Sequence, residues 1–249
     1  RTHSLLRRIL KMLDGKKVLA VVPARSGSKG IPDKNIQPLG GMSLIGWAGE
    51  VLKKTPWIDA KIISTDSELY AEEAKRHGLE SIFIRPNNIS DDKATAIDTI
   101  IHAVEQAEDY YKIIFDIVLI VEPTSPYRLI EDISGATQLL IDSGSDSVVC
   151  VAPIDTKYHP HKVLKISKNG MIDYFNKKGK KIHSRQQLEM LYARNGICYA
   201  LTRDCIIINN SIINEKTIPY IIKHHVINID DPIDLEWAEF LYSRGMFNY

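Results

Sequence analysis

Short apolar segments alternate with longer amphipathic segments over the first 150 residues of the chain. Apolar segments of about four to eight residues are typical of buried strands, and longer amphipathic segments are typical of helices. We therefore predict strands at residues 18–22, 60–65, 79–84, 117–121 and 147–151. The helices predicted between them cover residues 44–54, 68–77, 92–107 and 130–142. Because each connection is long enough to hold a helix, this order predicts an α/β fold with a doubly wound, mostly parallel sheet.

The pattern changes between residues 155 and 194, where Lys, His, Asn and Gly are frequent and apolar residues alternate only weakly. This segment is too polar for the core of a sheet and too long for an ordinary connection. We predict that it forms an inserted lobe or a dimerisation arm. Strands predicted at residues 196–201 and 220–229, and a closing helix at 233–244, then return the chain to the main domain.

These features divide the chain into an N-terminal extension at residues 1–16, an α/β domain at 17–154 and 195–249, and the arm at 155–194. The extension contains the short basic sequence SLLRRILKML. Cations interrupt its apolar residues, so it does not have the pattern of a secretory signal. We expect either a docking helix or residues that lie upstream of a native start at Met12.

Composition narrows the classes of partner. The 249 residues are 44 % hydrophobic and 25 % charged, with a net charge of +1. This balance favours neither nucleic acid nor an anionic membrane as a partner, and no apolar run reaches the about 20 residues needed to span a bilayer. Cys150, Cys198 and Cys205 lack metal-ligand or redox spacing, so we expect core residues of a reduced, cytoplasmic protein.

A basic loop follows the first predicted strand, which Pro23 ends because proline has no N–H to donate. Three cations and two glycines fall within it: Arg25, Gly27, Lys29, Gly30 and Lys34. The glycines allow backbone torsions that turn consecutive N–H groups toward one ligand. At the carboxyl edge of an α/β sheet, where ligands bind, such a loop suits a polyphosphate. Its spacing matches neither common phosphate-binding fingerprint, and a solvated basic loop is the alternative.

Residues 24–35 read ARSGSKGIPDKN, which resembles the signature loop of the CMP-sialic acid synthetases (acylneuraminate cytidylyltransferases), a family that includes CMP-legionaminic acid synthetases. Similar motifs extend to the end of the chain. The resemblance implies a Rossmann-like nucleotidyltransferase with an inserted dimerisation arm. It also implies transfer of a cytidylyl group from CTP to the anomeric hydroxyl of a nine-carbon 2-keto sugar acid. Mg²⁺ (or Mn²⁺) would be the cofactor and pyrophosphate the second product.

Residues 122–128 read EPTSPYR, which resembles the family's Q-P-T-S-P-x-R element at the sugar-acid site. The resemblance implies that Glu122, Thr124 and Ser125 bind the substrate. Glu122 departs from the pattern, because the family usually has Gln there. A proline-rich turn that closes a βα unit is the alternative interpretation.

Residues 227–231 read INIDD, which resembles the family's metal site of two Asp residues. Asp230 matches the second Asp, but Asn228 stands at the first and is a weaker ligand for Mg²⁺. The alternative is an acidic cap for the closing helix, with Asp231 before Pro232 at the first helical position.

The two departures can be one exchange of charge, since Gln becomes Glu122 and Asp becomes Asn228. Our hypothesis is that Glu122 supplies the carboxylate that Asn228 lacks and shares Mg²⁺ with Asp230. A rival hypothesis is that Glu122 faces an amine or hydroxyl of an unusual sugar.

The same resemblance implies which residues contact the nucleotide. Residues predicted to bind CTP are Arg25, Gly27, Lys29, Lys34, Asn35, Arg85 and Thr95. Arg25 and Lys29 would hold the triphosphate and stabilise the departing pyrophosphate. Lys34 and Asn35 would contact phosphate and ribose, and Arg85 and Thr95 the base and ribose.

The remaining contacts come from the arm and the strand after it. HPHK at 159–162 and SRQQ at 184–187 resemble family motifs of the arm, which imply that Lys162, Arg185 and Gln187 orient the substrate. A planar guanidinium at Arg185 could oppose phosphate charge and join the catalytic set with Arg25 and Lys29. The family's arm reaches the other subunit's site, which implies a homodimer; a solvated arm is the alternative. A further match implies substrate contacts at Arg194, Asn195 and Tyr199, although Arg194 stands one position closer to Asn195 than in the family.

His224 and His225 lie in the last predicted strand. Neighbouring residues of a strand face opposite sides, so at most one could enter the site. We expect both in the core or at the surface.

Two alternative functions remain at this point. One is a cytidylyltransferase for a pseudaminic or eight-carbon keto-sugar acid. The other is a non-catalytic protein that binds CTP or a sugar acid, which the neutral Asn228 would favour.

Overall fold

The computed structural model describes residue 13, residues 15–90 and residues 95–247. They fall into two compact units. The first comprises the chain up to Cys150 and from Asn195 onward, and the second comprises Val151–Arg194.

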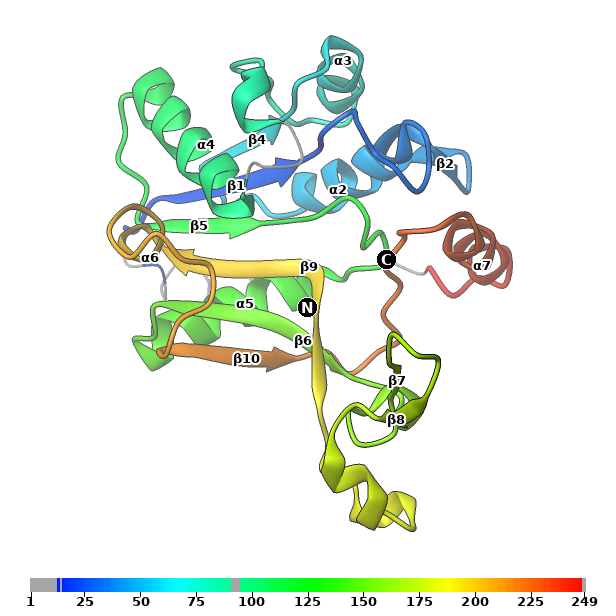
Figure 1. Ribbon diagram of the computed structural model, residues 1–249. Helices are drawn as coiled ribbons and strands as arrows, with labels where there is room; N and C mark the ends of the chain where they lie inside the picture. The colour runs from blue at the N-terminus through cyan, green and yellow to red at the C-terminus, as the bar shows by residue number, and fades with distance from the viewer. Residues whose placement is uncertain (1–12, 14, 91–94, 248–249) are drawn as a thin grey trace. The chain divides into compact units, whose positions relative to one another are not determined.

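A six-stranded sheet forms the centre of the first unit (Figure 1). In spatial order its strands are β10 (Thr217–Ile221), β6 (Ser147–Pro153), β9 (Tyr192–Thr202), β5 (Ile117–Ile120), β1 (Val18–Pro23) and β4 (Ala60–Ser64). The central strand β1 pairs in parallel with β4 and β5, whereas β9 runs antiparallel to β5. The mostly parallel sheet predicted from the sequence is confirmed. Because β1, β4 and β5 are parallel, the loops that follow them leave the same edge of the sheet.

Helices cover the sheet and begin at residues that can cap them. They are α2 (Leu44–Lys53), α3 (Glu68–Arg76), α4 (Ala96–Tyr111), α5 (Ile130–Ser143), α6 (Arg203–Ile207) and α7 (Pro232–Ser243). Ser43 accepts a hydrogen bond from the N–H of Gly46, and Ser67 from that of Tyr70, which satisfies donors that a helix start leaves open. Within the described ranges, no helix is long and apolar enough to cross a membrane.

The strand predicted at residues 79–84 is wrong. This segment meets β4 only at one isolated bridge between Ile62 and Glu80. The ring of Phe83 packs edge-on against His102 of α4, with centroids 4.9 Å apart, and Ile84 is 38 % exposed. Its apolar residues therefore reflect contact with a helix and not a place in the sheet.

The strand predicted at residues 220–229 is too long. β10 ends at Ile221, and residues 222–231 continue without regular structure. Ile227 and Ile229 are buried in a small apolar cluster with residues of α2 and α7. The alternation that predicted a strand therefore comes from this second core.

Other differences are small. The start predicted for the third helix at residue 92 lies outside the described residues, and α4 runs on to Tyr111. Sequence patterns missed α6 and the short antiparallel pair β2 (Pro38–Leu39) and β3 (Met42–Ser43). The predicted core cysteines are confirmed, since all three are buried and free: Cys150, Cys198 and Cys205.

The second unit contains an antiparallel pair of short strands, β7 (Leu164–Ile166) and β8 (Ile172–Tyr174). Three 3₁₀ turns accompany it: Thr156–Tyr158, Lys177–Lys181 and Arg185–Gln187. Several large apolar side chains of this unit are more than half exposed: Tyr158, Ile166, Met171, Ile172, Phe175 and Met190.

Candidate active site

The basic loop after β1 is fastened to the end of the neighbouring strand. The backbone N–H of Ala24 donates to the carbonyl of Ser64 at 2.9 Å. Ser26 donates both its N–H and its hydroxyl to the carboxylate of Asp66, at 2.8 and 3.0 Å. The part of Asp66 in holding the loop was missed from the sequence. Its position directly after a strand at the carboxyl edge was the available signal.

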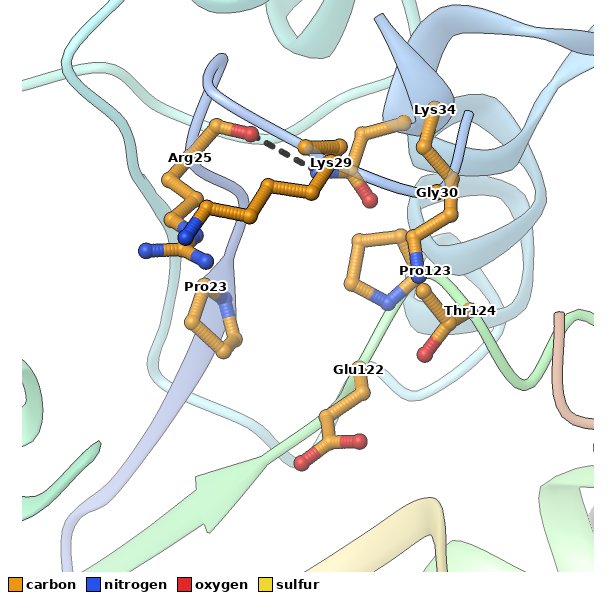
Figure 2. A pocket seen from close by; sticks show the side chains of 10 residues that line it. Pro23, Arg25, Lys29, Gly30, Lys34, Glu122, Pro123 and Thr124 are labelled. Carbon is orange, nitrogen blue, oxygen red and sulfur yellow. Dashed lines mark hydrogen bonds between the residues drawn. The ribbon is translucent and has the colours of Figure 1, made fainter. Parts of the chain in front are cut away.

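A cavity of about 270 Å³ opens between this loop and the turn after β5 (Figure 2). It is lined by Pro23, Arg25, Ser28, Lys29, Gly30, Lys34, Asn35, Glu122, Pro123 and Thr124. Eight of these were predicted site residues or belong to the loop at residues 24–35: Arg25, Ser28, Lys29, Gly30, Lys34, Asn35, Glu122 and Thr124. The structure therefore brings three cations and one carboxylate from distant parts of the chain to one cavity.

Two residues at the end of the loop set its shape. Asp33 has a left-handed backbone, with φ of 49°, and Tyr70 of α3 donates its hydroxyl to the Asp33 carboxylate at 3.1 Å. Burial and the nearby Asp33 raise the pKa of Tyr70, which keeps it a donor. Asn35 is buried, and its amide donates to the carbonyl of Arg25 at 3.1 Å (Figure 2, dashed line). This bond closes the loop on itself.

Lys34 links the loop to the segment before α7. Its ammonium donates to the carbonyl of Ile229 at 2.9 Å and to the carboxylate of Asp230 at 3.0 Å. The Lys34 side chain is only 15 % exposed, whereas that of Asp230 is 65 % exposed. The Lys34 ammonium therefore binds the carboxylate that was predicted to hold a metal.

The glycines act differently from the prediction. Among the described residues, neither Gly27 nor Gly30 has a positive φ, so the predicted torsional role is wrong. A Cβ on Gly30 would lie 2.5 Å from the carbonyl oxygen of Asp230. Gly30 is therefore required for close approach of two backbones, while a Cβ on Gly27 would meet nothing within 4 Å.

Arg128 holds the turn after β5 from inside the protein. Its fully buried guanidinium donates to the carbonyl of Ile197 at 3.0 Å, to that of Gly196 at 3.1 Å and to that of Glu122. The Glu122 side chain lies against Gly196, where an added Cβ would clash with its carboxylate. The sequence identified Arg128 only as the last residue of a motif, and its structural role was missed.

The same turn is joined to residues 228–230. The N–H of Ile229 donates to the carbonyl of Thr124 at 2.8 Å. Ser125 is fully buried; its hydroxyl donates to the amide oxygen of Asn228 at 3.3 Å and accepts from the N–H of Gly196 at 3.1 Å. The amide nitrogen of Asn228 in turn donates to the Asp230 carboxylate. Glu122 and Asn228 thus belong to segments that meet at one edge, although Asn228 lies beyond the last strand.

A profile of the cytidylyltransferase family matches residues 19–233 of this chain. The chain belongs to the cytidylyltransferase family. It is 33 % identical to the CMP-N,N'-diacetyllegionaminic acid synthase of Legionella pneumophila, over 89 % of this chain and 94 % of the relative. It is 28 % identical to the pseudaminic acid cytidylyltransferase of Campylobacter jejuni, over 91 % of this chain and 97 % of the relative. The resemblance inferred from the loop motif is therefore confirmed.

A solved structure of a CMP:2-keto-3-deoxy-manno-octonic acid synthetase complexed with CTP has a TM-score of 0.67 to the cytidylyltransferase. The match covers 92 % of this chain and 100 % of that one, at 18 % identity. At this identity the likeness concerns the fold, and it agrees with the Rossmann-like nucleotidyltransferase that was expected.

Three predicted nucleotide contacts of the cytidylyltransferase lie outside the cavity lining: Gly27, Arg85 and Thr95. Arg85 is buried, and it donates its N–H to the carbonyl of Thr65 at 2.7 Å and its Nε to Ser90 at 3.1 Å. Burial lowers the pKa of Arg85; nearby Asp66 opposes this and Arg25 adds to it. Thr95 is exposed and caps α4 by accepting from the N–H of Asp98.

The other predicted contacts divide between the units. Asn195 and Tyr199 are buried in the first unit, where the Asn195 side chain accepts from the N–H of Ile197 at 3.2 Å. Four belong to the second unit and are exposed: Lys162, Arg185, Gln187 and Arg194. Arg185 donates to the Thr156 hydroxyl at 3.0 and 3.1 Å. Local bonds therefore order its guanidinium within that unit.

Proposed function

We propose that this cytidylyltransferase transfers CMP from CTP to the anomeric hydroxyl of a nine-carbon 2-keto sugar acid of the sialic or legionaminic type. The observation that carries the proposal is the cavity at the carboxyl edge of the sheet, where Arg25, Lys29 and Lys34 come together. Three cations that line one cavity suit a triphosphate, because its charge is the largest that any part of the reactants bears. A nucleotide transferase needs this arrangement, whereas a solvated basic loop does not.

Charge and position explain how the site would act. The sugar hydroxyl gives up its proton to water, its oxygen forms a bond to the α-phosphorus, the bond from the α-phosphorus to the bridging oxygen of the β-phosphate breaks, and pyrophosphate leaves with the extra negative charge. Arg25 and Lys29 lie where they can stabilise that charge, and preorganised cations in a partly enclosed site lower the barrier strongly. Lys34 and the buried Asn35 fix the loop, so little reorganisation accompanies the reaction.

The relatives support the proposed sugar class. The Legionella relative is named for a diacetyllegionaminic acid and the Campylobacter relative for pseudaminic acid. The greater identity to the first favours the sialic or legionaminic type, and a pseudaminic substrate is the nearest alternative. The eight-carbon acid is supported by likeness of fold alone.

Residues near the cavity fit Mg²⁺ in part. Mg²⁺ takes oxygen ligands and commonly binds one or two carboxylates together with substrate phosphates. Asp230 offers an exposed carboxylate, which accepts from the amide nitrogen of Asn228, while the Asn228 amide oxygen accepts from the Ser125 hydroxyl. Across the described part of the chain, no group of three or more His, Cys, Asp or Glu side chains could hold a metal alone. We propose that Asp230, with Glu122 in support, holds Mg²⁺ that the triphosphate also binds; the ion would lower the charge on the α-phosphate.

Exchanging the two unusual side chains tests this metal proposal. We expect Glu122→Gln to raise the Mg²⁺ concentration for half-maximal turnover about tenfold, since removing a carboxylate weakens the site. The double change Glu122→Gln with Asn228→Asp should restore most of the loss. The rise in melting temperature on adding Mg²⁺ provides a readout that needs no turnover. The double variant would place a second carboxylate in contact with that of Asp230, so Mg²⁺ should stabilise it more than it stabilises Glu122→Gln.

The double variant decides between the hypotheses. If its metal dependence is no better than that of the worse single variant, the exchange of charge is wrong. A rise in the Michaelis constant for the sugar alone, with Mg²⁺ dependence unchanged, would favour contact between Glu122 and an amine or hydroxyl of the sugar.

We also propose that the protein is a homodimer whose second unit completes the site of the partner. Exposed apolar side chains of that unit support this, because monomeric proteins rarely leave so many large apolar groups exposed together. Lys162, Arg185 and Gln187 would then orient the sugar acid and oppose phosphate charge.

Hybrid dimers test the shared site. Arg25→Ala and Arg185→Ala subunits should each be nearly inactive alone, since each lacks one half of every site. After subunit exchange, half of the dimers should be mixed, and each mixed dimer should hold one intact site of its two. About a quarter of the wild-type activity should therefore return. Arg76→Ala, an exposed change on α3, is the control partner. Absence of recovery after proven exchange would contradict a site shared between subunits.

The reaction itself is tested by pyrophosphate release from CTP with Mg²⁺ and a nine-carbon keto acid. We expect release that requires the acid and stops when a chelator removes the metal. Binding of CTP without release, across nine-carbon and eight-carbon acids, would support the non-catalytic alternative.

A further inference from the structure

His224 lies in the irregular segment that leads from β10 to Asp230, and it contacts α5. Its Nε2 is 2.8 Å from a carboxylate oxygen of Asp132, and its Nδ1 is 2.9 Å from the carbonyl oxygen of His225. A carbonyl oxygen can only accept a hydrogen bond, and so can an ionised carboxylate. Both ring nitrogens must therefore donate, which makes His224 an imidazolium paired with Asp132.

Asp132 is a firm anchor for this pair. It is buried in the first turn of α5, and the same carboxylate oxygen accepts the N–H of Leu129 at 2.8 Å. A negative charge is favoured at a helix start by the helix dipole. The helix is itself packed on β10, because Gly135 leaves room for the ring of Tyr220.

The histidine also contacts the turn after β5. The rings of Tyr127 and His224 meet edge-on, with centroids 5.0 Å apart, and Tyr127 packs in turn on Phe247. Tyr127 stands next to Arg128, which holds the carbonyl of Glu122. One imidazolium therefore contacts the turn that carries Glu122 and belongs to the segment that carries Asp230.

We infer that His224 is a positioning residue, whose pairing with Asp132 sets the relative placement of the turn after β5 and of residues 228–230. The inference goes beyond the proposed function, and it rests on that function only for the readout of CTP binding. His224 is not among the residues that line the cavity. Its effect reaches the cavity through the contacts of Ser125 with Asn228 and of Lys34 with Asp230.

This placement of the two segments therefore requires that His224 is protonated. The Asp132 hydrogen bond raises the pKa of His224 above its ordinary value, burial opposes this, and the His225 carbonyl adds to it. Because the folded pKa exceeds the unfolded one, the contribution to stability is fully present below the unfolded pKa and is lost as pH rises through the folded pKa. The titratable or charged groups around the ring are Asp132 on α5, Tyr127 on the turn, Tyr220 on β10 and the neighbouring Lys223 and His225.

The experiment combines imidazole NMR of the wild-type protein with CTP binding. We expect His224 to carry protons on both ring nitrogens up to a pH above the pKa of an ordinary histidine, and to lose one only beyond it. The affinity for CTP should fall about tenfold as pH rises through that transition. His224→Gln should bind CTP about tenfold more weakly at pH 6 and lack this pH dependence, while His225→Gln, its exposed neighbour, should behave as wild type.

Two results would overturn the inference. One is a His224 that loses a ring proton at or below the pKa of an ordinary histidine. The other is a His224→Gln protein that melts as wild type does and keeps the wild-type affinity and pH dependence for CTP. The NMR result needs neither nucleotide nor sugar, so a failure of the proposed reaction leaves the test of His224 intact.

Discussion

Replacing Arg128 by Met is expected to lower the free energy of unfolding by about 3–5 kcal/mol, because three backbone carbonyls would lose a charged donor inside the protein. Those carbonyls belong to Glu122, Gly196 and Ile197, and Arg128 is fully buried. The loss should also loosen the turn that lines the cavity, so turnover should fall even where the variant remains folded. Urea unfolding of the purified protein measures the change directly.

Arg76→Met is the matched control for this prediction. Arg76 lies on α3 with 75 % of its side chain exposed and makes one ion pair, with Glu73 at 3.2 Å. Exposed pairs of this kind contribute little, so no measurable loss of stability is expected. Equal unfolding curves for Arg128→Met and Arg76→Met would contradict the role given to Arg128.

Replacing Gly30 by Ala is expected to lower kcat/KM for CTP about 10²-fold, since displacement of a catalytic loop by about 1 Å has effects of that size. The added Cβ would lie 2.5 Å from the carbonyl oxygen of Asp230. Relief of this clash requires the backbone at Gly30 or at Asp230 to shift, which would displace residues of the cavity lining. Steady-state kinetics with varied CTP measures the effect.

Gly27→Ala separates this steric effect from a general need for glycine in the loop. A Cβ on Gly27 would meet nothing within 4 Å, so a far smaller loss is expected from the same chemical change. If Gly27→Ala proved as harmful as Gly30→Ala, flexibility or torsion would matter more than the approach to Asp230. Melting temperatures of both variants exclude simple unfolding.

Local signals predicted much of the fold. The apolar run of β1 and the serines at 43 and 67 act within a few residues, so the sequence shows them directly. Residues 79–84 and 222–229 were mistaken for strands because burial against a helix or a second core also produces apolar patterns. Periodicity reports burial, and it does not say which element buries the side chain.

The candidate site was predictable where one segment carried the chemistry. Arg25, Lys29, Lys34 and Asn35 follow one another on a single loop, and the structure places them together. Asp66, Arg128 and His224 act through partners that lie distant in the chain, 40 residues away for Asp66 and 92 for His224. No local pattern reveals such a partner, so their roles emerge only from the folded structure.

The most direct test of the central claim uses CTP labelled either at the α- or at the γ-phosphate, with a panel of nine-carbon and eight-carbon keto-sugar acids. We predict that one nine-carbon acid acquires the α-label in a CMP-sugar, while the γ-label appears in pyrophosphate. Transfer to an eight-carbon acid in preference to every nine-carbon acid would contradict the proposed substrate. Bound CTP with both labels retained, whatever acid is added, would contradict the proposed reaction.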